Sequence, residues 1–338
     1  MRLLITGAAG FIGFHLVRRL LADGHAVVGY DGMTPGRALS LKRARSALLA
    51  GTEGFHAITG MLGDFDTLRR AVDLAAPEVI VHLAARTGVR APAEEARLYV
   101  NANVVGSQKL LDAARVAGAK HILLASSSSV YGANPRASFA EGDPIDAPLS
   151  LYAATKNGME AIAHAHAHLY AQPITVFRPF TVYGPWGRPD MALFRFVDAI
   201  ANDRPIDVYG DDRVSRDFTY VDDVVEAIVR LIAVIPGESN RASSAGATDT
   251  LARLAPFRVV NIGEGRPIEL SEAIATIERL LGKRAVRNSL PMQPGDMPRT
   301  CADPALLEAL TGFRPATPIA SGLAALVAWY RDYTGGRA

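Results

Sequence analysis

The sequence predicts an α/β protein with a doubly wound parallel sheet and a smaller C-terminal α/β domain. Short apolar runs alternate with segments of helical period, and this strand–helix alternation is typical of a parallel sheet. With 338 residues, 49% of them hydrophobic and 21% charged, the chain can bury a large core and is longer than one such domain requires. The expected sheet domain comprises 1–178 with returning segments near 215–235 and 256–263, and the second domain comprises mainly 179–338.

The first strand is expected at residues 2–6, an apolar run that ends at Gly7, and a helical pattern follows from Phe14. The glycines of Thr-Gly-Ala-Ala-Gly-Phe-Ile-Gly therefore occupy a strand-to-helix turn. Gly7 permits the tight turn, Gly10 lets the backbone approach a pyrophosphate, and Gly13 allows close helix packing. This arrangement indicates a Rossmann-type nucleotide site; a glycine-rich turn without a ligand is the alternative.

A second apolar run at residues 26–30 ends at Asp31, about 20 residues beyond the glycines, where a carboxylate would accept hydrogen bonds from an adenosine ribose. A carboxylate there repels a 2′-phosphate, which favours NAD over NADP. Arg37 and Arg43 keep NADP as an alternative. The basic cluster from Arg37 to Arg45 is expected to form the solvated face of a helix.

Further strands are expected at residues 78–83, 121–125 and 174–178. A net charge of +2 provides no general field for binding nucleic acid. There is no run of about 18 apolar residues, so no membrane span is expected. The one cysteine, Cys301, excludes an internal disulfide and favours a reducing, cytoplasmic location.

Tyr152 and Lys156 lie four residues apart in Ser-Leu-Tyr-Ala-Ala-Thr-Lys and would share one face of a helix. A phenol has an unperturbed pKa of ~10, so a catalytic tyrosine needs nearby positive charge to favour its phenolate. The Lys156 ammonium would supply this charge and would reach a ribose hydroxyl of a bound dinucleotide. A surface pair worth about 0.2–0.5 kcal/mol is the alternative, but the glycine turn in the same chain favours redox chemistry.

The same helix has an apolar stripe of Met159, Ile162 and Ala163 that could pack against a second subunit. Its three alternate histidines, between residues 164 and 168, suggest a metal site. On a helix, however, the middle one points away from the other two, so no metal is expected.

The chain resembles the extended short-chain dehydrogenase/reductase superfamily, and within it most closely the UDP-glucuronate 4-epimerases. The stretches that support this resemblance are residues 6–13, 82–85, 125–132, 150–156, 178–192, 216–223 and 292–296. The run Trp-Gly-Arg-Pro-Asp-Met-Ala, from Trp186, is the most specific and resembles enzymes that act on a uronic acid. The resemblance implies an NAD-binding Rossmann domain, a UDP-sugar-binding domain and a homodimer.

The implied reaction is the reversible, NAD-dependent 4-epimerisation of UDP-glucuronic acid to UDP-galacturonic acid. Tyr152 would remove the C4 hydroxyl proton while C4 gives hydride to tightly bound NAD, forming a 4-keto sugar and transient NADH. The superfamily's third catalytic group corresponds here to Ser127, whose hydroxyl would hydrogen-bond the C4 oxygen. The hydride would then return to the other face of the ketone, which regenerates NAD in each turnover.

The residues expected to bind the cofactor are those of the glycine turn, the ends of the following strands and the catalytic helix. They are Gly7, Gly10, Phe11, Ile12, Gly13, Asp31, Asp64, Leu83, Ala84, Ala85, Asn103, Tyr152, Lys156 and Pro179.

A uronate substrate needs a cation close to C6, and Arg188 is the first candidate because a guanidinium can bind a carboxylate with two hydrogen bonds. A loop salt bridge is the alternative role for this arginine. Thr181 is a candidate neutral helper, and Ser128 and Ser129 are candidate polar contacts to the carboxylate. Ser129 could equally be a strand-end hydroxyl that satisfies loop backbone.

For the UDP group, Arg216 resembles the family arginine that binds the diphosphate, and Asp296 the residue that holds the uridine ribose. Gln293 stands where UDP-galactose 4-epimerases have an arginine. For the cation close to C6, Arg90 is a weaker candidate than Arg188, because its loop departs from the family pattern Ala-Gly-Val-Arg-Tyr-Ser.

Four alternative functions share parts of this pattern. Nucleotide-sugar 4,6-dehydratases have an Asp-Glu pair where this chain has Ser128 and Ser129, so dehydration would lack its acid and base. UDP-glucuronate decarboxylases of the UDP-xylose synthase type share the fold and the Tyr/Lys pair, and UDP-glucose/UDP-galactose 4-epimerases share the reaction. An NAD-bound sensor or scaffold is the non-enzyme alternative.

Overall fold

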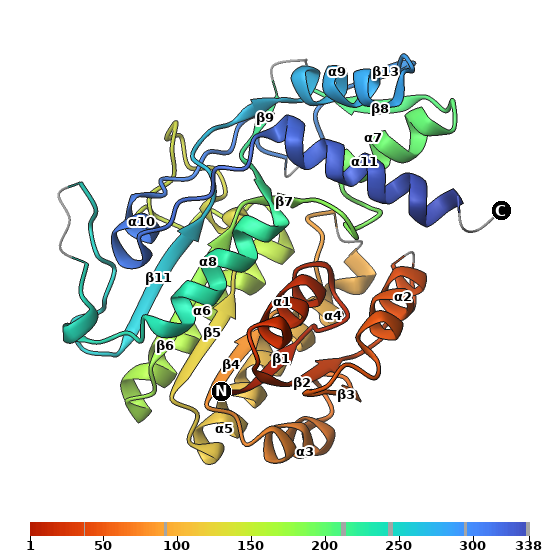
Figure 1. Cartoon of the computed structure of the whole chain (residues 1–338). Helices are drawn as coiled ribbons and strands as arrows, with labels where there is room; N and C mark the ends of the chain where they lie inside the picture. Colours follow the sequence, from red (N-terminus) through yellow and green to blue (C-terminus); the bar gives the residue numbers. More distant parts are fainter. Residues whose placement is uncertain (37, 91–92, 211–213, 243–245, 294–295, 336–338) are drawn as a thin grey trace.

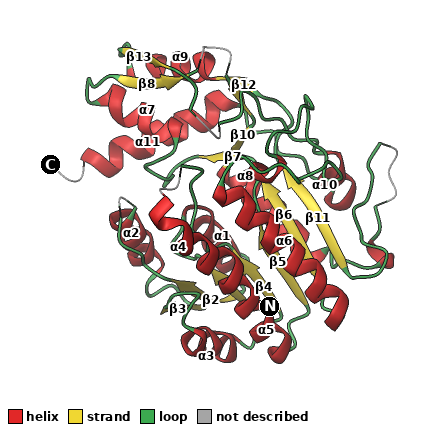
Figure 2. Cartoon of the chain, turned by 180° about the vertical axis from the view of Figure 1, so that it is seen from behind, coloured by secondary structure: helices red, strands yellow, loops and turns green. Residues whose placement is uncertain are grey.

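The computed structural model describes the chain except for residues 37, 91–92, 211–213, 243–245, 294–295 and 336–338. Within the described part, a parallel sheet covered on both faces by helices lies below a smaller lobe (Figure 1). The sheet and its helices form the first lobe, and the second lobe lies over the carboxyl ends of the strands (Figures 1 and 2).

The sheet has seven strands in the order β11-β6-β5-β4-β1-β2-β3, and every neighbouring pair is parallel. Its strands are β1 (Arg2–Thr6), β2 (Ala26–Asp31), β3 (Phe55–Thr59), β4 (Val79–His82), β5 (His121–Ala125), β6 (Ile174–Pro179) and β11 (Phe257–Ile262). This topology confirms the predicted doubly wound sheet. The last strand comes from far along the chain and pairs with β6, within the segment expected to return.

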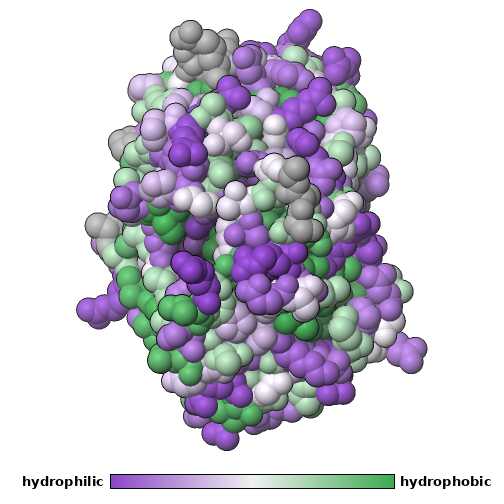
Figure 3. Space-filling view, turned by 90° about the vertical axis from the view of Figure 1, so that its left-hand side faces the viewer, coloured by the Kyte–Doolittle hydropathy of each residue, from purple (hydrophilic) through white to green (hydrophobic). Residues whose placement is uncertain are grey.

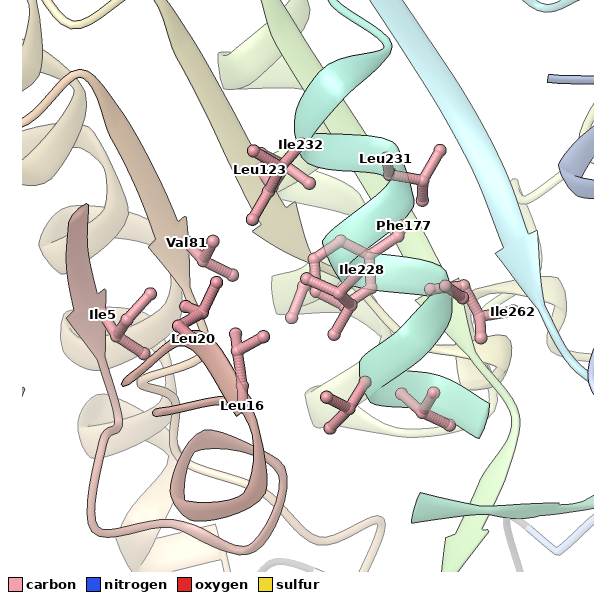
Figure 4. Packing of buried hydrophobic residues seen from close by; sticks show 14 of the residues in the cluster. Ile5, Leu16, Leu20, Val81, Leu123, Phe177, Ile228, Leu231, Ile232 and Ile262 are labelled. Carbon is pink, nitrogen blue, oxygen red and sulfur yellow. The ribbon is translucent and has the colours of Figure 1, made fainter. Parts of the chain in front are cut away.

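Alternate residues of the central strands face opposite helix layers. Leu3 and Ile5 of β1 pack with one layer, and Leu4 packs with the other. The first layer contains α1 (Phe11–Ala22) and α8 (Val221–Ala233), as Figure 4 shows around Ile5, Leu16, Leu20 and Ile228. The second contains α3 (Phe65–Ala75), α5 (Gly106–Ala117) and α6 (Leu151–Tyr170). Helix α2 (Leu39–Leu49) packs beside α1.

The segment between β4 and α5 is irregular at residues 83–90 and helical from Ala93 onward. It contains the short 3-10 helix Ala93–Glu95, α4 (Ala96–Val100) and a π-helix at Asn101–Val105.

The second lobe has its own apolar core, formed mainly by three helices and one short strand. These are α7 (Ala192–Ala201), α9 (Leu270–Leu281), α11 (Ile319–Gly335) and β8 (Ile206–Tyr209), and β13 (Arg287–Leu290) pairs with β8 at its edge. Three pairs of short strands also follow the main sheet: β7 (Thr181–Tyr183) with β10 (Phe218–Tyr220), β9 (Ser215–Arg216) with β12 (Ile268–Glu269), and β8 with β13. Helix α10 (Ala305–Thr311) packs on α8 and β11, back on the first lobe.

The apolar stripe of α6 faces the sheet. Met159 and Ala163 are fully buried in the protein's own core, and Ile162 packs partly against it. The interpretation of this stripe as a possible subunit contact is therefore wrong: a helix that covers a sheet uses its apolar stripe for that purpose.

No helix in the described ranges combines the length and the apolar character that crossing a bilayer would require. On the face shown in Figure 3, hydrophilic and hydrophobic residues are interspersed.

Candidate active site

The glycine turn after β1 has no room for side chains. Gly7 has φ +74°, and a Cβ there would lie 2.8 Å from the backbone nitrogen of Ala84. A Cβ on Gly10 or Gly13 would lie 2.8 Å or 2.1 Å from the carbonyl oxygen of Gly7. Bare backbone at the N-terminus of α1 is the arrangement that lets a pyrophosphate approach, so the turn fits a dinucleotide. Phe11 and Ile12 begin this helix.

The carboxyl end of β4 lies against the same turn. The Leu83 backbone N–H donates to the carbonyl of Thr6 (3.1 Å), and the Ala84 N–H donates to the Thr6 hydroxyl (3.2 Å). Ala85 follows them and is also half-buried. Pro179 ends β6 farther along the same edge of the sheet.

Asn103 is completely buried and its side-chain amide is bonded within the protein. The amide donates to the Arg86 carbonyl (2.9 Å) and to the Thr155 hydroxyl (3.0 Å), and it accepts from the Arg86 N–H (2.8 Å). Asn103 therefore joins the segment after β4 to α6. A direct contact with the cofactor stays a prediction.

Asp31 ends β2 beside the glycine turn and is 7% exposed. One carboxylate oxygen accepts from the Ala9 N–H (3.2 Å), and the other accepts from the Met33 N–H (2.9 Å) and from Lys42 (2.6 Å). Asp64, in contrast, is an exposed N-cap of α3, where the Thr67 hydroxyl and N–H hold the pKa of its carboxyl below the ordinary value.

The basic cluster before and within α2 is not uniformly solvated. Arg37 lies outside the described residues and Arg43 is exposed, but Arg45 is 1% exposed. The Arg45 guanidinium donates to the carbonyls of Ala9, Trp186 and Gly187. The expectation of a fully solvated face is therefore wrong at Arg45, because the carbonyl oxygens of two loops compensate its burial.

Ser127 and Tyr152 form the centre of the candidate site. Ser127 follows the end of β5 and caps the 3-10 helix Ser128–Tyr131, accepting from the Ser129 N–H and donating to its hydroxyl (both 3.1 Å). Tyr152 lies in the first turn of α6, which Ser150 caps by accepting from the Ala153 N–H. Burial raises the pKa of the Tyr152 phenol, while its hydrogen bond with Ser127 and the charge of Arg188 lower it.

Lys156 is 2% exposed, and its ammonium donates to the Ala125 carbonyl at the end of β5 (2.7 Å). Burial lowers its pKa to about 8, opposed by the charge of Glu160. The expected effect of this ammonium on the Tyr152 phenol stays a prediction. The Tyr152 pKa is raised, because burial outweighs the nearby charges.

A solvent-open cavity lies next to Ser127 and the start of α6. It brings together five residues assigned to the substrate from the sequence, namely Ser128, Ser129, Thr181, Arg216 and Asp296. Further lining residues include Val89, Leu149, Ser150 and Thr300. The wall is rich in hydroxyl groups and has one cation and one carboxylate.

Arg90 and Asp296 form an ion pair (2.6 Å), and the Arg90 guanidinium stacks over the Tyr209 ring at 4.8 Å. Burial lowers the pKa of the neighbouring Arg216, an effect that the charge of Asp296 opposes. Gln293 is half-buried, and its carbonyl accepts from the Asp296 N–H (3.1 Å). The three residues assigned to UDP therefore lie near one another, and Arg90, the weaker candidate for the carboxylate, lies with them.

Arg188 lies in the loop after β7 and forms a two-point salt bridge with Asp190. This loop salt bridge is the alternative role that the sequence left open for Arg188. The guanidinium also lies close enough to Tyr152 and Tyr99 for their charges to affect its pKa. It therefore remains near the candidate reaction centre.

Three functional candidates were missed from the sequence: Arg45, Tyr99 and Thr300. For Arg45 a signal was present, because Leu41, Arg45 and Leu49 recur every four residues on the buried face of α2. Tyr99 lies in the short helix α4, which spans too few residues to show a helical period, and Thr300 lies in an irregular segment, where residue spacing gives no information on position.

Comparisons with known proteins agree on the family. The model of the NAD dependent epimerase/dehydratase family matches residues 3–242. A "Probable UDP-glucuronate 4-epimerase" of Rhizobium meliloti (strain 1021) is 58% identical over 330 residues, which cover 98% of this chain and 97% of that relative. UDP-glucuronate 4-epimerase 1 of Arabidopsis thaliana is 40% identical over 337 residues, covering 98% of this chain and 77% of the relative.

Two solved structures show the same architecture. UDP-glucuronic acid 4-epimerase from Bacillus cereus, in complex with UDP-glucuronic acid and NAD, has a TM-score of 0.87 and 31% identity over 98% of this chain and 100% of that one. DesIV, a dTDP-glucose 4,6-dehydratase from Streptomyces venezuelae, has a TM-score of 0.85 and 29% identity over 99% and 98%. Architecture alone does not separate these two activities. Together with the family match and the glycine turn, it establishes that the chain belongs to the NAD dependent epimerase/dehydratase family.

Proposed function

We propose that this protein interconverts UDP-glucuronate and UDP-galacturonate by 4-epimerisation. The observation that supports this most directly is a cavity next to Ser127 and Tyr152 that Ser128 and Ser129 line with hydroxyls rather than carboxylates. Arg188 supplies a guanidinium near the same phenol. The 58% identity to a probable UDP-glucuronate 4-epimerase supports the uronate as substrate.

NAD, when bound, accepts a hydride from C4 of the sugar and returns it to the opposite face. The turn of Gly7, Gly10 and Gly13 would hold its pyrophosphate, since a side chain at any of the three would clash with neighbouring backbone and displace the turn. Asp31 would accept from the adenosine ribose hydroxyls while retaining its backbone donors. The segment 83–85, Asp64, Asn103 and Pro179 remain proposed contacts.

Tyr152 would take the proton from the C4 hydroxyl as the C–H bond breaks, and Ser127 would orient that hydroxyl. The raised pKa means that the phenol is protonated at neutral pH in the ligand-free protein. Nearby positive charge must therefore lower the pKa of the phenol before Tyr152 can act as a base. The buried Lys156 ammonium and the Arg188 guanidinium are the groups of this chain that can provide it.

The substrate carboxylate would take the place of Asp190 on Arg188, which already presents two nitrogens to a carboxylate. Thr181, Ser128 and Ser129 would add neutral hydrogen bonds from the cavity wall. Arg216 and Arg90 would bind the diphosphate, with Asp296 and Gln293 near the uridine.

The 4-keto form of a uronate is a β-keto acid, which loses CO2 when its C5–C6 bond stands perpendicular to the carbonyl plane. An epimerase must hold that bond away from this alignment while the ring turns. Decarboxylation is therefore the nearest rival reaction, and the neutral-hexose epimerases are the second.

A proton NMR time course of purified protein with UDP-glucuronate and no reductant tests the proposal. We expect the anomeric and H4 signals of UDP-galacturonate to grow to a stable ratio. Appearance of UDP-xylose or a 4-ketopentose would instead establish decarboxylation. Absence of turnover would exclude UDP-glucuronate as the substrate. If the purified protein also contains bound NAD, that result would favour a role as an NAD-bound sensor or scaffold.

We further propose a homodimer in a reducing cytoplasm. Val105, Val116 and Leu169 are 41%, 69% and 69% exposed around α5 and α6, on the side away from the sheet core. A buried, free Cys301 is compatible with a reducing compartment. Light scattering should give twice the chain mass of 36.0 kDa.

A further inference from the structure

The loop that leads to Arg188 is held by side chains from the cofactor half of the molecule. Three successive carbonyl oxygens, of Pro185, Trp186 and Gly187, accept hydrogen bonds from two side chains. His15 of α1 contacts the first through Nε2 at 2.9 Å. Arg45 of α2 donates to the other two.

Arg45 also joins this loop to the glycine turn. One terminal nitrogen donates to the Ala9 carbonyl at 3.0 Å, and the other donates to Trp186 and Gly187. The side chain is 1% exposed, and its Nε is buried without a hydrogen-bond partner. Burying a guanidinium costs free energy, and the three carbonyl acceptors offset this cost only if the side chain is held in the geometry that reaches all of them. The planar fork spans two loops that are far apart in sequence.

The backbone between these anchors is unusual. Trp186 has φ +59°, a left-handed conformation that non-glycine residues rarely adopt. Its ring packs against Phe14 of α1 at 5.6 Å and Trp329 of α11 at 5.2 Å, while its carbonyl accepts from Arg45. The loop is therefore fixed from both lobes at the residue pair that immediately precedes Arg188.

We propose that Arg45, assisted by His15, is a positioning residue that sets the place of the Arg188 guanidinium relative to Tyr152 and the substrate carboxylate. This inference rests on the proposed uronate epimerase function. Arg45 also couples cofactor binding to substrate binding, because its side chain contacts both the glycine turn that would receive the pyrophosphate and the loop that presents Arg188. Arg45 touches neither ligand in this role and acts through Arg188.

Arg45→Lys tests the proposal, since one ammonium cannot reach both loops as a planar fork does. Turnover of UDP-glucuronate is measured for Arg45→Lys, Arg188→Ala and the double variant. Arg69→Lys, at a 62% exposed position of α3, is the matched control. Arg45→Lys should lower kcat/KM by about 10- to 100-fold, the size expected for a small misplacement of a binding group. In the Arg188→Ala background the further loss should be less than about twofold.

An equal loss in both backgrounds would overturn the proposal, because Arg45 would then act independently of Arg188, for example on the cofactor turn or on the fold. An unchanged kcat/KM for Arg45→Lys would overturn it as well. If Arg45→Lys does not fold, His15→Leu and His15→Gln are measured instead, each alone and combined with Arg188→Ala. The leucine variant should lose activity only when Arg188 is present, and glutamine, which retains an N–H donor, should recover part of it.

Amide hydrogen exchange of the peptide spanning 184–190 gives a readout that needs no turnover. Exchange should be at least about tenfold faster in Arg45→Lys and unchanged in Arg69→Lys. Unchanged exchange in Arg45→Lys would contradict the anchoring. If exchange is faster in Arg45→Lys but the wild-type protein does not convert UDP-glucuronate, the proposed function is rejected. The anchoring of the loop by Arg45 would then still hold.

Discussion

At the scale of single residues, the candidate site differs from its sequence pattern in how charge is arranged. Tyr152 and Lys156 were identified as a pair from their spacing, but the ammonium lies on the Ala125 carbonyl and the phenol hydrogen-bonds Ser127. Spacing on a helix fixes which residues share a face, and does not determine which acceptor a long lysine side chain selects. The burial that governs both pKa values depends on the whole fold.

The Lys156 pKa predicts a pH dependence. Because burial lowers it from 10.5 to about 8, the folded protein loses this ammonium as the pH rises through about 8. We expect kcat for UDP-glucuronate to fall about tenfold per pH unit above that value, as positive charge near Tyr152 is lost. A kcat–pH profile at saturating substrate measures this. A kcat that stays constant between about pH 7 and 9.5 would show that the Lys156 charge is not required.

Arg188→Ala should lower kcat/KM for UDP-glucuronate by about 10- to 100-fold, corresponding to the loss of a charge-assisted pair worth about 1.5–3 kcal/mol. Steady-state kinetics measure the effect. Arg195→Ala, at the exposed ion pair with Asp207, is the control and should change little. Equal kinetics for Arg188→Ala and wild type would remove Arg188 from the carboxylate site.

At the scale of elements, the buried strands could be predicted because each is a continuous apolar run. The predicted run 121–125 coincides with β5, and 2–6 coincides with β1. β3, in contrast, is an edge strand whose side chains are mostly half-buried or exposed, so no apolar run marks it. The π-helix at Asn101–Val105 was also missed, since its sequence has no distinguishing period.

The glycine turn predicts the effect of adding one methyl group. Gly13→Ala would place a Cβ 2.1 Å from the Gly7 carbonyl oxygen, so the turn must shift and the phosphate cradle must open. The purified variant should contain far less bound NAD than wild type, as measured by extraction and absorbance. Gly142→Ala is the control, because no atom lies within 4 Å of its added Cβ. Full NAD content in Gly13→Ala would argue against the pyrophosphate site.

At the scale of the whole molecule, the division into two domains is less sharp than residue ranges suggest. The core on the α1 face includes Leu3 and Phe14 from the start of the chain, and Val182, Leu306 and Leu307 from beyond residue 178. Sequence patterns could identify the elements of this core. They could not show that α10 packs back on α8, because that contact joins segments remote along the chain.

The contacts between the lobes predict cooperative unfolding. Scanning calorimetry of the purified protein should show one thermal transition, because Trp186 packs on Phe14 of one lobe and Trp329 of the other, and late segments of the chain complete the core of the first lobe. Two separate transitions would show that the lobes fold as independent domains. Added NAD should raise the midpoint of the single transition by mass action.

The late return of β11 to the sheet also has a consequence for protein synthesis. β6 pairs with β5 on one side and β11 on the other, and residues 180–256 separate β6 from β11 along the chain. At ~5–20 residues per second, a ribosome needs about 4–15 s to make that stretch. Throughout this interval the nascent chain presents an apolar strand with an open backbone edge, the feature by which partly made chains aggregate. The chain is thus most prone to aggregate during synthesis, before the last strand of its main sheet has been translated.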